Sequence, residues 1–214
     1  MATRPVYMSC STHPYRETWN VEFVYNRGLA TSQKRKNITA IHNAFHETFP
    51  ALKVLEISSK SMQEGGKALS AFHLLKYVPS LGKSVPVENI YQAGKVFRNG
   101  GPFTDLLYGS PRDAKRDERL RTSGPLTAFH FEGAYFPIHP QSAFYDFIYI
   151  SALRENKALA DVILQYDAFT DVEFSPKTGL NCQAGSAALF ASLCRQNLMD
   201  TVTDFASFLT VLGE

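Results

Sequence analysis

The sequence predicts a single α+β domain over residues 1–214, rich in helices and with a few short strands. The chain is long enough to bury a sizeable core, and 44% of its residues are hydrophobic. Apolar residues recur at helical spacing in several segments, whereas the segments of strand character are short. Strands and helices do not alternate regularly, which argues against a doubly wound parallel sheet. We divide the domain into an N-terminal strand and helix at 1–50, a core at 51–196 and a C-terminal helix at 197–214.

The N-terminal quarter of the chain is expected to hold one strand and one long helix after an irregular start. Residues 1–18 are rich in Thr, Ser and Pro, which favours irregular structure. Apolar and polar residues alternate over 19–25 and predict a strand. Apolar residues recur at steps of three and four over 31–49, which predicts a helix that Pro50 ends.

Helices dominate the prediction for the rest of the chain. A second strand is expected at 53–58 and a third at 126–131, because both segments carry strand-forming residues in short runs. Further helices are expected at 86–97, 111–121, 140–156, 157–165, 182–196 and 199–212, and a loop at 99–105.

Composition and charge limit the functions that this chain can have. The net charge is only +2, so any contact with nucleic acid requires a local basic patch. The three cysteines have neither a disulfide pattern nor metal-ligand spacing, which indicates free thiols in a reducing cytoplasm. No signal region and no apolar run of about 20 residues is present, so we expect a cytoplasmic protein without a membrane partner. The six histidines form no spaced cluster and predict no metal site.

The segment VENIYQAGKVF, residues 87–97, is the most informative part of the sequence. On a helix, spacings of three, four and seven place four side chains on one face: Glu88, Tyr91, Gln92 and Lys95. A carboxylate can act as a general acid or base, and a lysine of lowered pKa can attack a carbon to form a Schiff base. The same spacing is also typical of a solvated helix face with a Glu–Lys pair, so spacing alone leaves both interpretations open.

The pattern Glu-x-x-(Tyr/Phe)-Gln-x-x-Lys-x-Phe at 88–97 resembles the signature helix of the NADAR family. Members of that family are N-glycosidases that act on ADP-ribosylated bases or on related phosphoribosylated nitrogen compounds. The order of further elements agrees with the family: a strand and polar loop at 55–61, a Leu-Ser-x-Phe element at 69–72, an Asp-x-Phe element at 167–169 and then Asn181. The resemblance covers roughly residues 52–196, and it identifies the predicted core as NADAR-like.

Within the family, the chain resembles the NADAR antitoxins that are encoded beside DarT-type DNA ADP-ribosyltransferase toxins. The segments that carry this resemblance are EISSKS, LSAF, YQAGKVF, GGPFTDL, AFYDFIY, DAFTDVEF and NCQA. The resemblance implies a DNA ADP-ribosyl glycohydrolase that removes ADP-ribose from guanine bases, in single-stranded DNA, and so counteracts the toxin. ADP-ribose would be the product, and no cofactor is implied.

The resemblance and the helix face together suggest a role for each candidate residue. Lys95 is expected to attack the anomeric carbon of the ribose, and Glu88 to move protons to the ring oxygen or the leaving base. Gln92 would orient the ribose. The other expected substrate contacts are Tyr91, Phe72, Asp105, Asp167, Asp171 and Asn181, together with Ser58, Ser59 and Lys60 near the phosphates.

A basic stripe is expected along the predicted helix at 111–121. Its members are Arg112, Lys115, Arg116 and Arg119. The stripe either contacts phosphates of ADP-ribose or DNA, or forms a solvated helix face with Asp113 and Asp117 as partners.

The chain departs from the family pattern at several positions. Asn89 stands where many members have His, Ala71 stands where they have Asn, and no Trp-Gly follows the Asp-x-Phe element. These departures argue against transferring the activity of those relatives that cleave riboflavin-pathway intermediates. A metabolic N-glycosidase of that kind remains one alternative, and a non-catalytic reader of ADP-ribosylated nucleic acid is another. An ADP-ribosyltransferase, which would consume NAD, is a third.

Overall fold

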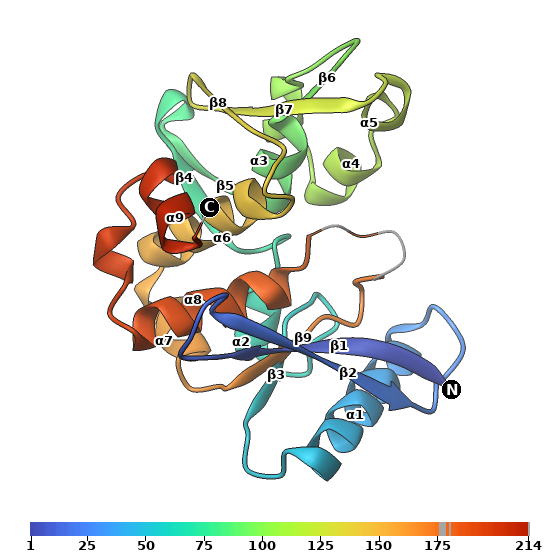
Figure 1. The fold of residues 1–214 in the computed structure, drawn as a ribbon. Coiled ribbons are helices and arrows are strands. Elements are labelled where there is room, and N and C mark those ends of the chain that lie inside the picture. Colours follow the sequence, from blue (N-terminus) through green and yellow to red (C-terminus); the bar gives the residue numbers. More distant parts are fainter. Residues whose placement is uncertain (176–178, 180, 214) are drawn as a thin grey trace. The chain divides into compact units, whose positions relative to one another are not determined.

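The computed structural model describes residues 1–175, 179 and 181–213, and it confirms the α+β class. The chain forms two compact units: unit 1 comprises Met1–Ser70 and Ala158–Glu214, and unit 2 comprises Ala71–Lys157 (Figure 1). The single domain over residues 1–214 stays a prediction. None of the helices in the described part of the chain has the length and apolar character that crossing a membrane requires.

Unit 1 is built on a four-stranded sheet in the order β2-β1-β9-β3. The central pair, β1 and β9, is antiparallel, whereas β3 runs parallel to β9. The strands are β1 (Ala2–Ser9), β2 (Arg16–Phe23), β3 (Val54–Glu56) and β9 (Ala168–Thr170), and the helices are α1 (Thr31–Thr48), α2 (Glu64–Ala68), α7 (Lys157–Ile163), α8 (Gln183–Arg195), the 3-10 helix η3 (Met199–Thr201) and α9 (Phe205–Val211).

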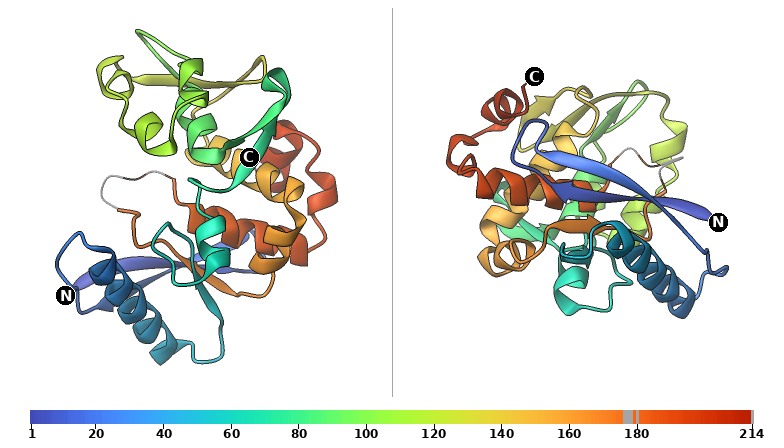
Figure 2. Two further views of the ribbon diagram at one scale, coloured as in Figure 1. Left: turned by 180° about the vertical axis from the view of Figure 1, so that it is seen from behind. Right: turned by 60° about the horizontal axis from the view of Figure 1, so that its bottom comes forward.

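The alternating side chains of β1 explain why this sheet is covered on both faces. Val6 and Met8 join the apolar cluster that includes Ile41 and Phe45 of α1. Tyr7 lies between them in sequence and points the other way, against Gly185 of α8. Helices α1 and α8 therefore cover opposite faces of the sheet, as Figure 2 also shows from two sides.

Two predictions for unit 1 are wrong in detail. Residues 1–18 are not irregular, because β1 pairs with β2 along its whole length, from Ala2 opposite Phe23 to Ser9 opposite Arg16. The predicted helix at 199–212 is interrupted, because Asp204 and Ser207 form a capping box that starts α9 anew after η3. The helix predicted at 31–49 is confirmed as α1.

Unit 2 combines a hairpin, a three-stranded antiparallel sheet in the order β6-β7-β8, and several short helices. The elements are β4 (Leu75–Val78), η1 (Pro79–Leu81), β5 (Lys83–Pro86), α3 (Val87–Ala93), β6 (Lys95–Phe97), η2 (Thr104–Leu107), α4 (Pro111–Arg116), α5 (Arg119–Thr122), β7 (Leu126–Phe131), β8 (Ala134–Phe136) and α6 (Ala143–Glu155). Every residue of α3 is buried, so this helix forms the centre of the unit.

The helix predicted at 86–97 is shorter in the structure and gives way to a strand. Helix α3 stops at Ala93 because Gly94 lies directly against β7. A Cβ atom at Gly94 would come within 2.7 Å of the His130 carbonyl oxygen, so only glycine fits there. The backbone N–H of His130 donates to the Gly94 carbonyl (2.7 Å), and Lys95 then begins the pairing of β6 with β7.

The helix predicted at 111–121 is also divided, into α4 and α5. Ser110 caps α4 by accepting a hydrogen bond from the Asp113 backbone N–H, and Pro111 occupies the first turn. Asp117 has an extended backbone (φ −53°, ψ 128°) and ends α4, so the two helices do not share one continuous face.

Candidate active site

A chain of three polar side chains runs along α3 and into β6. The Lys95 ammonium nitrogen donates a hydrogen bond to Oε1 of Gln92 at 2.7 Å. The Gln92 amide nitrogen in turn donates to Oε1 of Glu88 at 2.9 Å. Although Lys95 lies in a strand and not on the helix, the structure thus brings these three predicted site residues together.

A second cation, Lys115, lies at this site, although the sequence pattern assigns it to a basic stripe on the helix predicted at 111–121. The Lys115 ammonium on α4 lies 3.5 Å from Oε1 of Glu88, and 5.4 Å from the centre of the Phe72 ring. The Glu88 carboxylate therefore faces the Gln92 amide and the Lys115 ammonium at the same oxygen. The 27-residue separation between Glu88 and Lys115 gives no periodic signal, so this ion pair could not be read from spacing.

The surroundings of Lys95 lower its pKa. Burial is the largest effect and lowers the pKa of Lys95 to about 8, with a smaller contribution from Lys115 in the same direction. Glu88 acts oppositely and raises this pKa. The ring of Tyr91, 4.6 Å from the ammonium nitrogen, also attracts the charged form. Burial outweighs both, so a useful fraction of the amine is neutral near physiological pH.

Aromatic rings pack around Tyr91, whose ring lies 4.6 Å from the Lys95 ammonium nitrogen. Tyr91 packs against Phe129 of β7, with ring centres 5.5 Å apart, and edge-on against Tyr145 of α6 at 5.1 Å. Phe129 stacks on Phe144 at 4.5 Å. The predicted contact residue Phe72 is half-buried on the side of Lys115. The arrangement places an amine of lowered pKa, a buried carboxylate and a bridging amide in one aromatic setting, which suits nucleophilic and acid–base chemistry.

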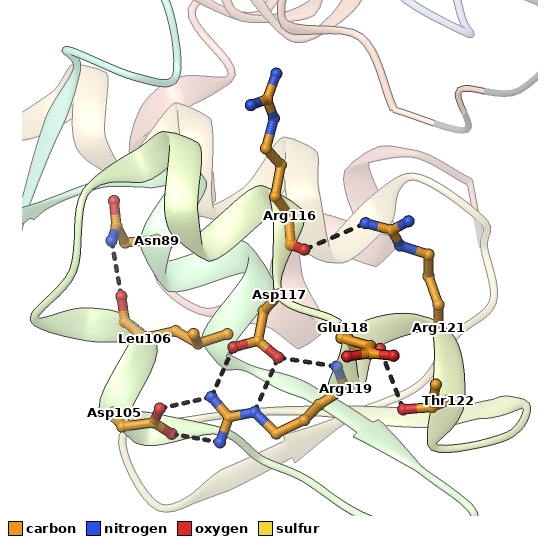
Figure 3. A network of polar contacts seen from close by, with 9 residues as sticks. All are labelled: Asn89, Asp105, Leu106, Arg116, Asp117, Glu118, Arg119, Arg121 and Thr122. Atoms are coloured by element: carbon orange, nitrogen blue, oxygen red, sulfur yellow. Dashed lines mark hydrogen bonds and ion pairs between the residues drawn. The ribbon is translucent and has the colours of Figure 1, made fainter.

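Arg119 is a structural clamp and does not belong to a free basic stripe (Figure 3). Its guanidinium binds Asp105 with two hydrogen bonds, at 2.6 and 3.1 Å, and Asp117 with two more, both at 2.8 Å. It also stacks over Phe103 at 4.6 Å. These contacts occupy Asp105 as well, and they fix the turn between α4 and α5 against η2. The prediction of one stripe of four cations is therefore wrong in its geometry: Arg112 and Arg116 are exposed on α4, Lys115 reaches Glu88, and Arg119 is ion-paired.

Asn89 connects α3 to the segment before α4. Its amide nitrogen donates to the backbone carbonyls of Leu106 (2.7 Å) and Gly109 (2.9 Å). Within the described residues its Oδ1 atom has no hydrogen-bond partner, although the residue is fully buried. Asn89, which stands where many members of the family have histidine, thus holds the loop that leads into α4.

The predicted phosphate loop lies in unit 1, immediately after β3. Ser58 is buried and its hydroxyl accepts from the Lys60 backbone N–H at 3.1 Å, whereas Ser59 and Lys60 are half-buried. The neighbouring Glu56 is buried and accepts hydrogen bonds from the Thr170 hydroxyl (2.6 Å) and the Val172 N–H (2.8 Å). Burial raises the pKa of Glu56. This network joins the loop to the end of β9, and sequence reasoning missed it.

The remaining candidates of unit 1 flank the same region of the chain. Asp171 accepts hydrogen bonds from the Gln183 amide (2.9 Å) and from the backbone N–H of Glu173 (2.9 Å). Asp167 accepts from the Lys53 backbone N–H at 3.0 Å and lies 3.6 Å from Arg195. Asn181 is half-buried just before α8. Their predicted contacts with substrate stay predictions.

Unit 2 also contains a pocket of about 350 Å³ that does not include the polar chain of α3. Ile90, Ala93 and Gly94 line it from α3, and Glu132 borders it from the β7–β8 turn. Ile90 and Ala93 follow Glu88 by two and five residues, and these spacings place them on the opposite side of the helix. The pocket is therefore separate from the Lys95 site.

A family model described as DarT1-associated NADAR antitoxin matches the chain over residues 2–214. No curated protein matches it.

Proposed function

The chain belongs to the family of DarT1-associated NADAR antitoxins, and we propose that it acts by hydrolysing the N-glycosidic bond between ADP-ribose and a guanine base of single-stranded DNA. Membership in this family makes it the antitoxin of a DarT system. The hydrolysis would restore the base that the toxin modifies and would release ADP-ribose.

The lowered pKa of Lys95, whose amine is hydrogen-bonded to Gln92 beside Glu88, is the observation that supports this proposal. An ordinary lysine, with a pKa near 10.4, is neutral to only about 0.04% at pH 7, whereas a pKa of about 8 leaves roughly 10% neutral. The lowered pKa thus increases the neutral, reactive amine about 200-fold at neutral pH. A solvated helix face, the alternative interpretation of the 87–97 segment, would not produce this change.

The residues of unit 2 support a covalent route. The Lys95 amine forms a bond to the anomeric carbon while the bond from that carbon to the base nitrogen breaks and its electron pair stays with the base. Glu88 accepts the proton that the attacking nitrogen loses and passes it to the leaving base. The bond between the anomeric carbon and the ring oxygen then breaks as the Lys95 nitrogen forms an imine with that carbon. The electron pair of the broken bond stays on the oxygen, and Glu88 carries the second proton of the nitrogen to it. Water adds to the imine and releases ADP-ribose and the free amine.

Gln92 and two exposed cations of α4 would serve binding in this scheme. Gln92 orients Lys95 directly, through the hydrogen bond of 2.7 Å, and contacts the ribose. Arg112 and Arg116 are the exposed cations of α4 that we propose for the DNA backbone.

Turnover under substrate excess tests the proposal. Purified protein is incubated with a ten-fold excess of an oligonucleotide that carries ADP-ribosylated guanine, and free ADP-ribose is measured by mass spectrometry. We expect complete release by the wild-type protein, no release by Lys95→Arg, and no reaction of either protein with NAD. Loss of no more than one adduct per protein molecule would indicate a reader of the modification and would contradict the proposal.

A further inference from the structure

The Glu88 carboxylate has two lysines near it, but only one of them pairs with it directly. Lys115 lies 3.5 Å from Oε1 of Glu88. Lys95 instead donates to the Gln92 side chain, which stands between the two charges. The more buried lysine is therefore the one without a direct carboxylate partner in this group.

The Gln92 amide can bridge Lys95 and Glu88 in only one orientation. Its oxygen must face the ammonium and its nitrogen must face the carboxylate. In the reverse orientation the amide N–H groups would face the ammonium N–H groups, and the amide oxygen would face the carboxylate oxygen. Lys95 consequently meets a neutral acceptor at 2.7 Å, while the charged acceptor lies beyond the amide. A direct ion pair at that distance would hold the ammonium form much more strongly.

Lys115 is well placed to compensate the charge of Glu88. The carboxylate is 6% exposed and the lysine side chain 58% exposed, so the pair stands at the surface end of a buried group. A buried carboxylate without a nearby cation is costly, and a partly buried pair is screened less than an exposed one. The Lys115 ammonium also lies over the Phe72 ring, which restricts its position further.

We propose that Lys115 is a positioning residue for the reaction, whose ammonium compensates the Glu88 carboxylate while Lys95 donates its hydrogen bond to the neutral amide of Gln92. This inference rests on the proposed function of Lys95 and Glu88, and it assigns to Lys115 a role other than the DNA contact that its sequence position suggests. Lys115 does not touch the reacting carbon in this scheme. It acts through Glu88 and through its own charge on Lys95.

Contacts at both ends of α4 fix the position of Lys115. The Ser110 cap and the Asn89 hydrogen bond to the Gly109 carbonyl hold the start of the helix. The Arg119 clamp holds its end, through Asp117 and Asp105. A helix of six residues would not hold its position alone, so these contacts maintain the distance between Lys115 and Glu88.

The charges around Lys95 agree with this role. The ionisable side chains on the elements that pack around α3 and β6 are Lys83 of β5, Asp105 of η2, Arg112, Asp113, Lys115 and Arg116 of α4, His130 of β7, and Tyr145, Asp146, Tyr149, Arg154 and Glu155 of α6. Of the charged neighbours, Glu88 raises the pKa of Lys95 and Lys115 lowers it. Removing the Lys115 charge should therefore leave Glu88 unopposed and raise the pKa of Lys95.

The test measures the Lys95 amine itself and needs no turnover. Competitive labelling with acetic anhydride between pH 6 and 11, with quantification of the Lys95 peptide by mass spectrometry, gives the midpoint of deprotonation. We expect a midpoint near pH 8 for the wild-type protein, and a midpoint about 0.5 to 1 pH unit higher for Lys115→Met, which keeps the side-chain stem but not the charge. Lys115→Arg should restore the wild-type midpoint. Arg116→Met, which removes a neighbouring cation of α4, is the matched control and should leave it unchanged.

Activity on a small substrate then separates positioning from DNA binding. On ADP-ribosylated guanosine, which has no DNA backbone, Lys115→Met should lower the single-turnover rate at pH 7 about three- to tenfold, with recovery above pH 9. An unchanged labelling midpoint in Lys115→Met, or an equal shift in Arg116→Met, would overturn the inference. Absence of turnover in the wild-type protein would instead overturn the proposed function, whatever the labelling shows.

Discussion

Replacing Glu88 with Gln is expected to lower the pKa of Lys95, because Glu88 is the neighbour that favours its charged form. The substitution keeps the size and planarity of the side chain. The new amide can still accept the hydrogen bond from Gln92, which is 2.9 Å long in the wild-type protein. Only the negative charge is lost, so the change isolates an electrostatic effect.

The magnitude follows from the geometry of the bridge. Two hydrogen bonds, of 2.7 and 2.9 Å, and the amide between them separate the two charges, which gives roughly 7 Å. At that distance and an effective dielectric constant of about 20 to 40, the attraction is about 1 to 2.5 kcal/mol. Since 1.36 kcal/mol corresponds to one pKa unit, the pKa of Lys95 should fall by about one unit, from about 8 toward 7.

Competitive labelling of Lys95 and single-turnover kinetics together give the assay. In Glu88→Gln the labelling midpoint should move down by about one pH unit, while the rate of ADP-ribose release falls by about 100-fold or more because the group that carries protons to the base and the ring oxygen is lost. The two readouts move in opposite senses, since the amine becomes more reactive and the enzyme less active.

A general loss of structure would give another pattern. Exposure of Lys95 to solvent would raise its midpoint toward 10.4. A midpoint that rises or stays near 8 in a folded Glu88→Gln protein would refute the assigned interaction between the two residues. A normal rate of release would refute the proton-transfer role of Glu88.

Three further predictions concern DNA binding, folding and pH. Charge reversal of Arg112 and Arg116 should weaken binding to modified single strands and flatten its salt dependence, whereas Arg119→Ala should chiefly lower the melting temperature; equal affinity of the double variant and the wild type in 50 and 200 mM salt would contradict this. Gly94→Ala should destabilise the protein by about 1 to 3 kcal/mol in urea unfolding, because its Cβ would approach a backbone carbonyl of β7 to 2.7 Å, and unchanged stability would show that β7 can move. Burial lowers the pKa of His42 from 6.5 to about 4, so the folded state binds this proton less readily than the unfolded state, and stability present above pH 6.5 should be lost, by up to about 3 kcal/mol, as the pH falls toward 4. His42→Gln should flatten that part of the stability profile, and an equally steep profile would assign the acid sensitivity to another group.

The parts of the fold that depend on local pattern could be predicted from the sequence. The strand at 126–131 and the helix at 31–49 agree with β7 and α1, because periodicity and a stop signal determine both. The start of the chain was missed, since the two apolar residues Val6 and Met8 give little evidence for a strand without its partner β2. The end of α3 depends on the approach of β7 to Gly94, which no local pattern reveals.

The candidate site could be predicted only in part. The family resemblance and the helical spacing selected Glu88, Gln92 and Lys95, and the structure places their side chains within hydrogen-bond distance along one chain. The same reasoning assigned Lys115 to a basic stripe, because it assumed one continuous helix at 111–121. The break at Asp117 and the ion pair between Lys115 and Glu88 arise from tertiary packing. The spacing of charged residues in the sequence therefore reveals neither of them.

Chemical trapping of the Lys95 adduct distinguishes covalent catalysis by this lysine from direct attack of water. The protein is mixed with ADP-ribosylated single-stranded DNA, reduced with borohydride during turnover, and examined as intact protein and as peptides by mass spectrometry. We expect the added mass of one reduced ADP-ribosyl group, located at Lys95, and none in Lys95→Arg, which cannot form the imine. A Lys95→Arg protein that releases ADP-ribose at nearly the wild-type rate, with no adduct trapped on the wild-type lysine, would contradict this expectation and would indicate that Glu88 activates water directly.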